Sequence, residues 1–348
     1  MSRTRTMRRY AVPASIAAGA LAVAGGVGMV MANADDLPEK SAEELHAAVQ
    51  NSDVQGLSGT VEQTADLGLP SAGTDSGDPA SLASGSHTLG VWYSANDKIR
   101  VAMQNDVQET DVIRDGADVF SWNSQSGESR HETLPADAAD APLWSPSLWS
   151  MTPSGVAEQA TGTAANTELD TDGTDVVAGR DTYGLILSPT DDTSLVDHVR
   201  MAVDAETGVP LSTQVFAKDD PESPALEVTF SDVTFGEPDA EAFQSPAPDD
   251  AAVQDGDVAG AVSDQGETWT TGSDWTTVGI SEMTEDELVD ALVEQGADPE
   301  AITGYLDELP QVDGGKLLES SLFTALIADD GNIYYGAVSS DALTGAIG

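Results

Sequence analysis

Apolar and polar residues alternate along most of the central part of the chain, and this pattern predicts β-strands. From Gly56 onward the period is two, and short turn sequences such as residues 94–97 separate the runs. The apolar positions of the runs are Leu89, Val91, Tyr93, Ile99, Val101, Met103, Phe120, Trp122, Tyr183, Leu185, Leu187, Val199, Met201, Val203, Leu211, Val215, Leu226, Val228 and Phe230. A meander of about eight or more such strands has one apolar and one polar face, and the apolar face must be covered.

Two segments are expected to cover this apolar face. Ser41 and Glu44 form a capping box, which predicts a short helix with Leu45 and Val49 on one side. The other segment is residues 142–153, whose prolines exclude a long regular helix. Its large apolar side chains, which are either a plug of the core or a movable lid over an apolar cavity, are Leu143, Trp144, Leu148, Trp149 and Met151.

The first 34 residues have the three parts of a secretory signal. Residues 1–10 are basic, residues 11–31 are uncharged and apolar, and the small-x-small sequence that signal peptidase recognises ends at Ala34. We expect cleavage after Ala34, with retention as a membrane anchor as the alternative. The chain is therefore expected outside the cytoplasm, either secreted or held at the outer face of the cytoplasmic membrane.

The composition excludes several partners. The chain has 13 Lys and Arg residues against 61 Asp and Glu residues, a formal net charge of −48, and no cysteine. Such a charge argues against nucleic-acid binding and against docking on anionic lipid through a basic patch. The acidity indicates either a salt-rich habitat or the solubility requirement of an exported protein. Without cysteine, the chain can form neither disulfides nor a thiolate metal site.

No catalytic or metal-binding pattern stands out in the sequence. The four histidines, His46, His87, His131 and His198, lack any metal-ligand spacing, so we expect no metal site. Residues 170–175 resemble a calcium loop, but the spacing is incomplete, and a plain turn is the preferred interpretation. There is no nucleophile elbow and no phosphate-binding loop. The chain is therefore predicted to be neither an enzyme nor a cofactor-binding protein.

The C-terminal part is predicted to be a small α+β extension. Residues 249–274 are rich in Asp, Ala and Gly and indicate an acidic linker, and the extension follows at residues 275–348. Thr284 and Glu287 form a second capping box. Residues 317–327 are interpreted as the end of a helix followed by a strand, and residues 329–332 as the turn of a hairpin. The sequence leaves open whether this block folds separately or docks on the larger domain at residues 35–248.

Short stretches of the chain resemble a known superfamily. They are residues 98–101, 115–122, 177–180, 203–210 and 242–248. Together with the order of the predicted elements, they resemble the LolA-like superfamily, which includes the RseB/MucB regulators, and in particular its actinobacterial members similar to outer-membrane lipoprotein-sorting proteins. The resemblance implies an α+β fold, a half-open antiparallel β-barrel wrapped around helices.

The resemblance also implies a function. It predicts non-enzymatic binding of a lipid or of lipoprotein acyl chains in an apolar cavity, or alternatively an envelope sensor of the RseB type that binds a protein such as an anti-sigma factor. The family's gating arginine has no counterpart at residues 94–96, and Arg100 is expected to point away from Ile99 and Val101. The predicted cavity residues are Val91, Tyr93, Ile99, Val101, Met103, Phe120, Trp122, Leu143, Leu148, Trp149, Met151, Tyr183 and Leu185.

Overall fold

The computed structural model describes the chain from residue 37 to residue 345, with gaps. The described residues are 37–52, 54–68, 82, 84–94, 98–104, 108–133, 152–161, 166–248, 251, 253–255, 268–271, 274–294 and 298–345. The described residues belong to one compact unit. The predicted signal segment, residues 1–34, lies outside the described residues.

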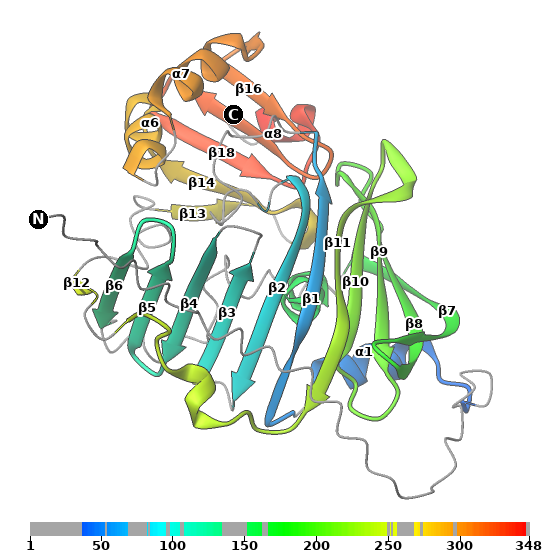
Figure 1. Ribbon diagram of the computed structural model, residues 1–348. Coiled ribbons are helices and arrows are strands. Elements are labelled where there is room, and N and C mark those ends of the chain that lie inside the picture. Colours follow the sequence, from blue (N-terminus) through cyan, green and yellow to red (C-terminus); the bar gives the residue numbers. More distant parts are fainter. Residues whose placement is uncertain are drawn as a thin grey trace, which may run out of the picture. The chain divides into compact units, whose positions relative to one another are not determined.

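Two sheets make up the described part of the chain (Figure 1). The larger has the spatial order β12-β6-β5-β4-β3-β2-β1-β11-β10-β9-β8-β7, and its two end strands do not pair with each other. The first strands are β1 (Gly56–Asp66), β2 (Ser84–Ser94), β3 (Lys98–Gln104), β4 (Glu109–Asp115), β5 (Asp118–Asn123) and β6 (Glu128–Thr133). The others are β7 (Thr167–Val177), β8 (Arg180–Pro189), β9 (Val196–Asp204), β10 (Pro210–Ala217), β11 (Asp220–Phe235) and β12 (Val253–Asp255). All neighbours are antiparallel except β12 and β6.

The larger sheet is open and curves around two helices, as the resemblance implied. Helix α1 (Ala42–Gln50) contacts β7 and β8, and helix α4 (Pro153–Thr161) contacts β10 and β11. The two helices also contact each other. We call the sheet face that carries them the inner face and the opposite one the outer face.

The capping box predicted for the first helix is confirmed. The Ser41 hydroxyl accepts a hydrogen bond from the Glu44 backbone N–H, and the Glu44 carboxylate accepts one from the Ser41 backbone N–H. Leu45 from this helix is 1% exposed. The box therefore starts the helix at the point where its apolar side meets the sheet.

Helix α4 was not predicted. It begins with Pro153 in the first turn, and the Thr152 hydroxyl accepts a hydrogen bond from the Gly155 backbone N–H. Thr followed by Pro is a helix-start signal, because proline lacks the N–H that the first turn leaves unpaired anyway.

The smaller sheet has the order β13-β14-β18-β17-β16-β15. Its strands are β13 (Thr268–Thr271), β14 (Val278–Glu282), β15 (Gln311–Val312), β16 (Gly315–Glu319), β17 (Thr324–Ala328) and β18 (Asn332–Gly336). Its helices are α6 (Glu285–Glu294), α7 (Pro299–Glu308) and α8 (Ser340–Gly345). Short 3-10 helices lie at η4 (Ala240–Phe243) and η5 (Asp274–Thr276).

One expectation for the C-terminal part needs correction, and other elements found there were not expected. Residues 317–327 form the two strands β16 and β17 rather than a helix end and a strand, since an apolar run does not by itself distinguish the two. Strands β12 and β13 lie within the predicted linker range of 249–274. Helix α7 was not predicted at all. The second capping box and the hairpin of β17 and β18 are confirmed.

The smaller sheet also makes contacts with the larger one. The Trp275 indole N–H donates to the Thr167 hydroxyl at 2.7 Å, and Trp275 belongs to the apolar cluster of the larger sheet. The Leu195 backbone N–H donates to the Ala337 carbonyl, and Ser194 forms a β-bridge with Val338. These contacts join the two sheets within one compact unit.

Candidate functional site

The inner face of the larger sheet carries a continuous apolar surface. Strand register places Ile99 opposite Tyr93, Val101 opposite Val91, and Met103 opposite Leu89. At the other end of the sheet, Leu185 pairs with Met201, and Leu187 with Val199. Side chains that are at most 2% exposed on this face are Val61, Leu89, Val91, Ile99, Val101, Leu185, Leu187, Val199, Met201, Val203, Leu211, Val228 and Phe230.

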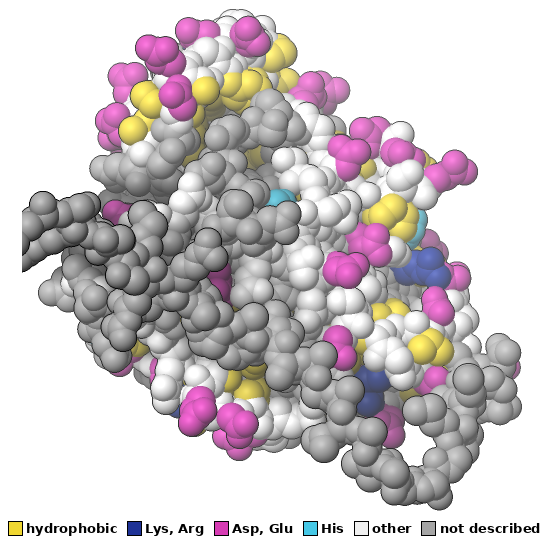
Figure 2. Space-filling model, in the orientation of Figure 1, with side chains coloured by type: hydrophobic (Ala, Val, Ile, Leu, Met, Phe, Trp, Pro, Cys, Tyr) yellow, Lys and Arg dark blue, Asp and Glu magenta, His cyan; other side chains and the backbone are white. Residues whose placement is uncertain are grey.

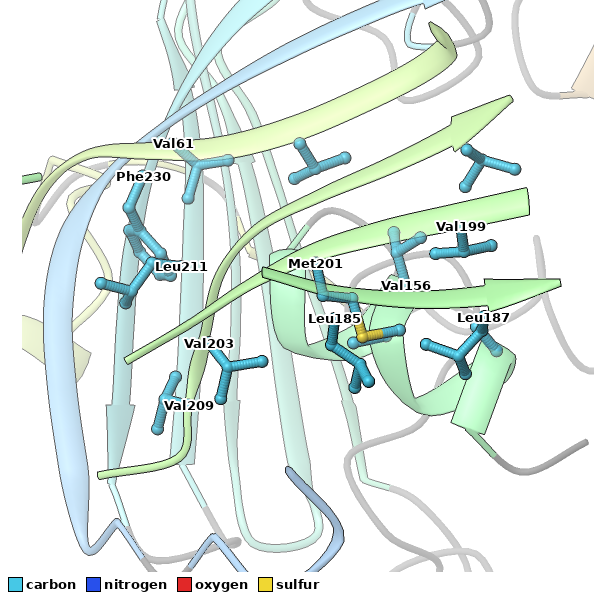
Figure 3. Packing of buried hydrophobic residues seen from close by; sticks show 14 of the residues in the cluster. Val61, Val156, Leu185, Leu187, Val199, Met201, Val203, Val209, Leu211 and Phe230 are labelled. Atoms are coloured by element: carbon cyan, nitrogen blue, oxygen red, sulfur yellow. The ribbon is translucent and has the colours of Figure 1, made fainter. Parts of the chain in front are cut away.

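The helices contribute small side chains to this face. Val156 and Ala157 of α4 are 7% and 0% exposed. Figure 3 shows Val156 beside Leu185, Met201 and Val199 of the sheet. The Thr213 hydroxyl on β10 donates to the Pro153 carbonyl at 2.9 Å, which attaches the start of α4 to the sheet.

Seven of the predicted cavity residues lie together on the inner face. They are Val91, Tyr93, Ile99, Val101, Met103, Tyr183 and Leu185. Sequence alternation was sufficient to place them, because side chains two apart on a strand share a face. Their role in ligand binding stays a prediction.

Phe120 and Trp122 lie on the other face, and their grouping with the inner-face residues is corrected. Phe120 pairs with Ile113, which pairs with Arg100 on the outer face of β3. Alternation shows which residues of one strand share a face. It does not show which face of the neighbouring strand lies on the same side of the sheet, because that depends on the pairing register. Leu143, Leu148, Trp149 and Met151 lie outside the described residues.

The inner face becomes polar at the far end of the sheet. Opposite Ile99 and Val101, strand β4 presents Arg114 and Val112. On the next strands, the row of Val112 continues with Ser121 and then Arg130, and the row of Arg114 continues with Val119 and then Glu132. The Arg114 side chain is largely buried and donates to the Gly116 carbonyl, and burial lowers the pKa of its guanidinium. The apolar part of the inner face therefore runs from β8 to β3.

Helices α1 and α4 pack mainly on one half of that apolar part. Their main contacts among the described strands are with β7, β8, β10 and β11. The side chains of β2 and β3 lie on the other half and are nevertheless fully buried, as Leu89, Val91 and Ile99 at 0% exposure demonstrate. The half at β2 and β3 is therefore buried without the main helix contacts that the other half has.

The outer face of the same strands holds a buried ion pair. The Arg100 Nε donates to Asp111 Oδ1 at 2.7 Å, and its Nη1 donates to the Ala242 carbonyl of η4 at 3.1 Å. The Arg100 guanidinium also lies over the Trp92 ring, 4.9 Å from its centroid. Arg100 therefore points away from Ile99 and Val101, as predicted, and holds the segment that follows β11 against the outer face.

Asp111 is unusual among the acids of this chain because it is 0% exposed. Burial raises the pKa of its carboxyl to about 6, although the neighbouring Arg100 acts in the opposite direction. Its Oδ2 atom has no hydrogen-bond partner. The carboxyl is nevertheless remote from the inner face, so the site has no acid–base pair formed by it.

Two of the stretches that carry the family resemblance form one structural unit. Arg180 donates from Nη2 to Asp204 Oδ1 at 3.1 Å and to Glu206 Oε2 at 2.8 Å. The Asp204 carboxylate also accepts hydrogen bonds from the backbone N–H and the hydroxyl of Thr207. Burial alone would raise the pKa of Asp204, but these hydrogen bonds outweigh it and lower the pKa.

This turn supports helix α1. Gly208 has φ +74°, and a Cβ there would lie 2.7 Å from the Ala48 carbonyl oxygen of the helix. The Ser52 hydroxyl after the helix donates to the Thr207 carbonyl. The resemblance at residues 203–210 thus has a structural basis, since the turn between β9 and β10 requires glycine to let α1 approach.

The segment before α1 is attached to the inner-face side of β8. The Tyr183 hydroxyl donates to the Pro38 carbonyl at 2.8 Å. The Lys40 ammonium lies 4.7 Å from the centroid of the same ring. The ring of Tyr183 therefore packs in the apolar cluster, while its hydroxyl holds the segment before α1 by a hydrogen bond.

The described residues contain no group of three or more His, Asp or Glu side chains arranged to hold a metal ion. Residues 170–175 are not a turn but part of β7, whose pairing with β8 shifts register between Thr171 and Thr174. Asp172 in this bulge pairs with Arg200 at 2.7 Å. Within the same described part, no helix is long and apolar enough to cross a membrane.

Comparison with known proteins gives structural matches only. No protein-family model matches the chain, and no curated protein matches it. The complex of MucA and MucB from Pseudomonas aeruginosa matches with a TM-score of 0.45 and 15% sequence identity, over 87% of this chain and 95% of that chain. A LolA superfamily protein from Nitrosomonas europaea matches with a TM-score of 0.22 and 10% identity, over 60% of this chain and 99% of that chain.

A third match is an outer membrane lipoprotein-sorting protein domain from Vibrio parahaemolyticus. Its TM-score is 0.24 and its identity 11%, over 61% of this chain and 97% of that chain. Identities and TM-scores this low transfer neither a ligand nor a partner to this chain.

Proposed function

We propose that the protein is a non-enzymatic binding protein of the bacterial cell envelope that holds a lipid or a lipoprotein acyl chain against the inner face of its larger sheet. The observation that carries this proposal is the continuous apolar surface from β8 to β3. Helices α1 and α4 pack mainly on one half of it. An acyl chain would bind against the other half, over Val91, Ile99 and Val101. Because these side chains are at most 2% exposed, entry of the chain would require this half to open.

The energetics of the proposal follow from apolar burial. Each methylene removed from water contributes roughly 0.8 kcal/mol, which corresponds to about a fourfold change in affinity. Affinity should therefore rise steeply with the length of a linear fatty acid, until the acyl chain is longer than the apolar face. A chain that binds only at the protein surface would show a much smaller increase per methylene.

The test uses residues 35–348 and a fatty acid that carries a photoreactive diazirine. After irradiation, peptide mass spectrometry locates the attached lipid. We expect attachment to the peptides of β2 and β3, and affinity that rises with chain length. Attachment confined to the outer face or to the smaller sheet would overturn the proposal, as would affinity independent of chain length.

Two neighbouring residues provide matched variants. Tyr93 lies on the inner face and Trp92 on the outer face of the same strand, and both are half-buried aromatic residues. We expect Tyr93→Ser to weaken lipid binding by about tenfold, given the lost apolar contact. Trp92→Ser should leave binding unchanged. Equal losses in the two variants would indicate general destabilisation of the strand instead of a ligand contact.

The alternative function is a sensor that binds another envelope protein. The observation that favours it is the smaller sheet, which has an apolar cluster of its own formed by Val278, Ile280, Leu317, Leu326, Tyr334, Val338 and Leu343. Binding an acyl chain does not require such a unit. Recovery of a specific protein together with the chain extracted from its host membrane would favour this function, whereas recovery of lipid alone would favour the carrier.

A further inference from the structure

Helices α6 and α7 pack against each other, and neither contributes a side chain to the apolar cluster of the smaller sheet, although Leu306 of α7 is buried. That cluster takes its side chains from β14, β16, β17, β18 and α8. The described side chains of α6 are at most half-buried, and Val293 is 36% exposed. The half-buried or exposed apolar residues of the two helices, which we call the helix-pair surface, are Leu288, Val289, Leu292, Val293, Ile302 and Tyr305.

The helix-pair surface has the spacing of a helix-binding strip. Leu288 and Leu292 are four residues apart, as are Val289 and Val293, so they form two adjacent rows along α6. Amphipathic helices bind such strips through apolar residues repeated every three or four positions. A strand partner would need a free sheet edge, which two helices do not supply.

All charged side chains on the two helices are negative. No lysine or arginine occurs between residues 285 and 308. Of the acids there, Glu285 and Asp307 pair with Lys316, and Glu287 caps the start of α6. Asp298 caps the start of α7. The remaining exposed acids with no ion pair to a described residue are Asp286, Asp290, Glu300 and Glu308. Figure 2 shows apolar side chains gathered between acidic ones over this region.

We propose that the helix-pair surface binds a cationic amphipathic helix of another protein. The apolar rows of α6 would bury the apolar side of that helix, and Asp286 and Asp290 would face its lysines or arginines. Charge excludes the competing occupants: a second copy of this chain and an anionic membrane would both be repelled by these acids. This interaction does not depend on the acyl-chain function; it rests on the alternative sensor function and names the chemistry of the partner for it.

The probe is a fluorescent amphipathic peptide of about 18 leucine and lysine residues, long enough to form a helix on binding. Its controls are a scrambled peptide of the same composition and a leucine–glutamate peptide of the same pattern. Fluorescence anisotropy with residues 35–348 should give the tightest binding for the amphipathic cationic peptide. Binding should weaken as salt rises, because the partner charges are exposed.

The chain offers a matched control for the apolar contact. Val176 on β7 is 48% exposed and also lies among acids, but outside the helix-pair surface. We expect Val293→Ser combined with Val289→Ser to weaken peptide binding by about tenfold. Val176→Ser should leave it unchanged. Circular dichroism of each variant verifies that the helices remain folded.

A second pair of variants tests the charge. Asp286→Asn with Asp290→Asn should reduce the salt dependence of binding, whereas Asp170→Asn with Asp175→Asn on β7 should not. If all these variants bind alike, or if the scrambled peptide binds as tightly as the amphipathic one, the attraction is a general property of an acidic protein and the proposed surface is wrong.

Discussion

The inner face of the larger sheet and the helix-pair surface bury apolar side chains to very different extents. Leu185 and Leu187 on the sheet are 0% exposed and lie in a cluster that extends over many strands. Leu288 and Leu292 on α6 have the same chemistry but are only half-buried. The comparison separates apolar residues that the fold already encloses from apolar residues that a partner could reach without any opening of the fold.

The physical reason for this difference is the number of elements that share each surface. A sheet face can pack against helices and against its own curved continuation, so its side chains are enclosed on all sides. Two short helices at the side of a small sheet enclose little volume between them. Part of the apolar side of each helix therefore remains in contact with solvent. Such exposure is unfavourable unless a partner covers these side chains.

The largest expected effect is a direct test of this comparison. Leu185→Ala should lower the free energy of unfolding by about 3 kcal/mol, because it leaves a cavity in a closely packed cluster. Leu292→Ala should lower it by only about 1 kcal/mol, since less area is buried. Urea denaturation followed by circular dichroism measures both. Similar losses in the two variants would mean that the helix pair is part of the core.

A somewhat smaller effect is expected at the turn that supports α1. Gly208→Ala should cost about 2 kcal/mol or more, since alanine is strained at φ +74° and its Cβ would clash with the Ala48 carbonyl. Gly127→Ala is the matched control, because Gly127 has φ +71° but no atom within 4 Å of the added Cβ. The difference between the two losses in free energy of unfolding, measured by urea denaturation, is the part caused by the close approach of α1 to residue 208. Equal costs would show that backbone conformation alone accounts for Gly208.

The smallest effect concerns two buried aspartates with opposite pH dependence. The raised pKa of Asp111, about 6, means that its contribution to the free energy of unfolding falls as pH rises from about 4 to about 6. The lowered pKa of Asp204 means that its contribution is complete above the unfolded value and is lost as pH falls below it.

Denaturation at several pH values distinguishes the two aspartates. Relative to the unaltered chain, Asp111→Asn should gain stability between pH 4 and pH 7, the range that includes the Asp111 pKa of about 6. The loss caused by Asp204→Asn should shrink below about pH 4. A stability difference for Asp111→Asn that does not change with pH would contradict the assignment of the raised pKa to this carboxyl.

Several features of the protein were determined by the sequence alone. The period of two correctly predicted that Val91, Ile99 and Leu185 lie on the apolar sides of their strands. It also predicted that Arg100 lies on the opposite side of its strand. The two capping boxes located the starts of α1 and α6. These predictions succeed because they depend only on neighbours within a few residues along the chain.

Only the tertiary structure decided which side chains of neighbouring strands lie on the same face of the sheet. Phe120 and Trp122 alternate as expected, but the register of β4 against β3 and β5 places them on the outer face. The acidic stretch at residues 170–175 continues as a strand because β8 offers it a pairing edge. Pairing register and the packing of α4 depend on residues far apart in the sequence, and no local pattern encodes such contacts.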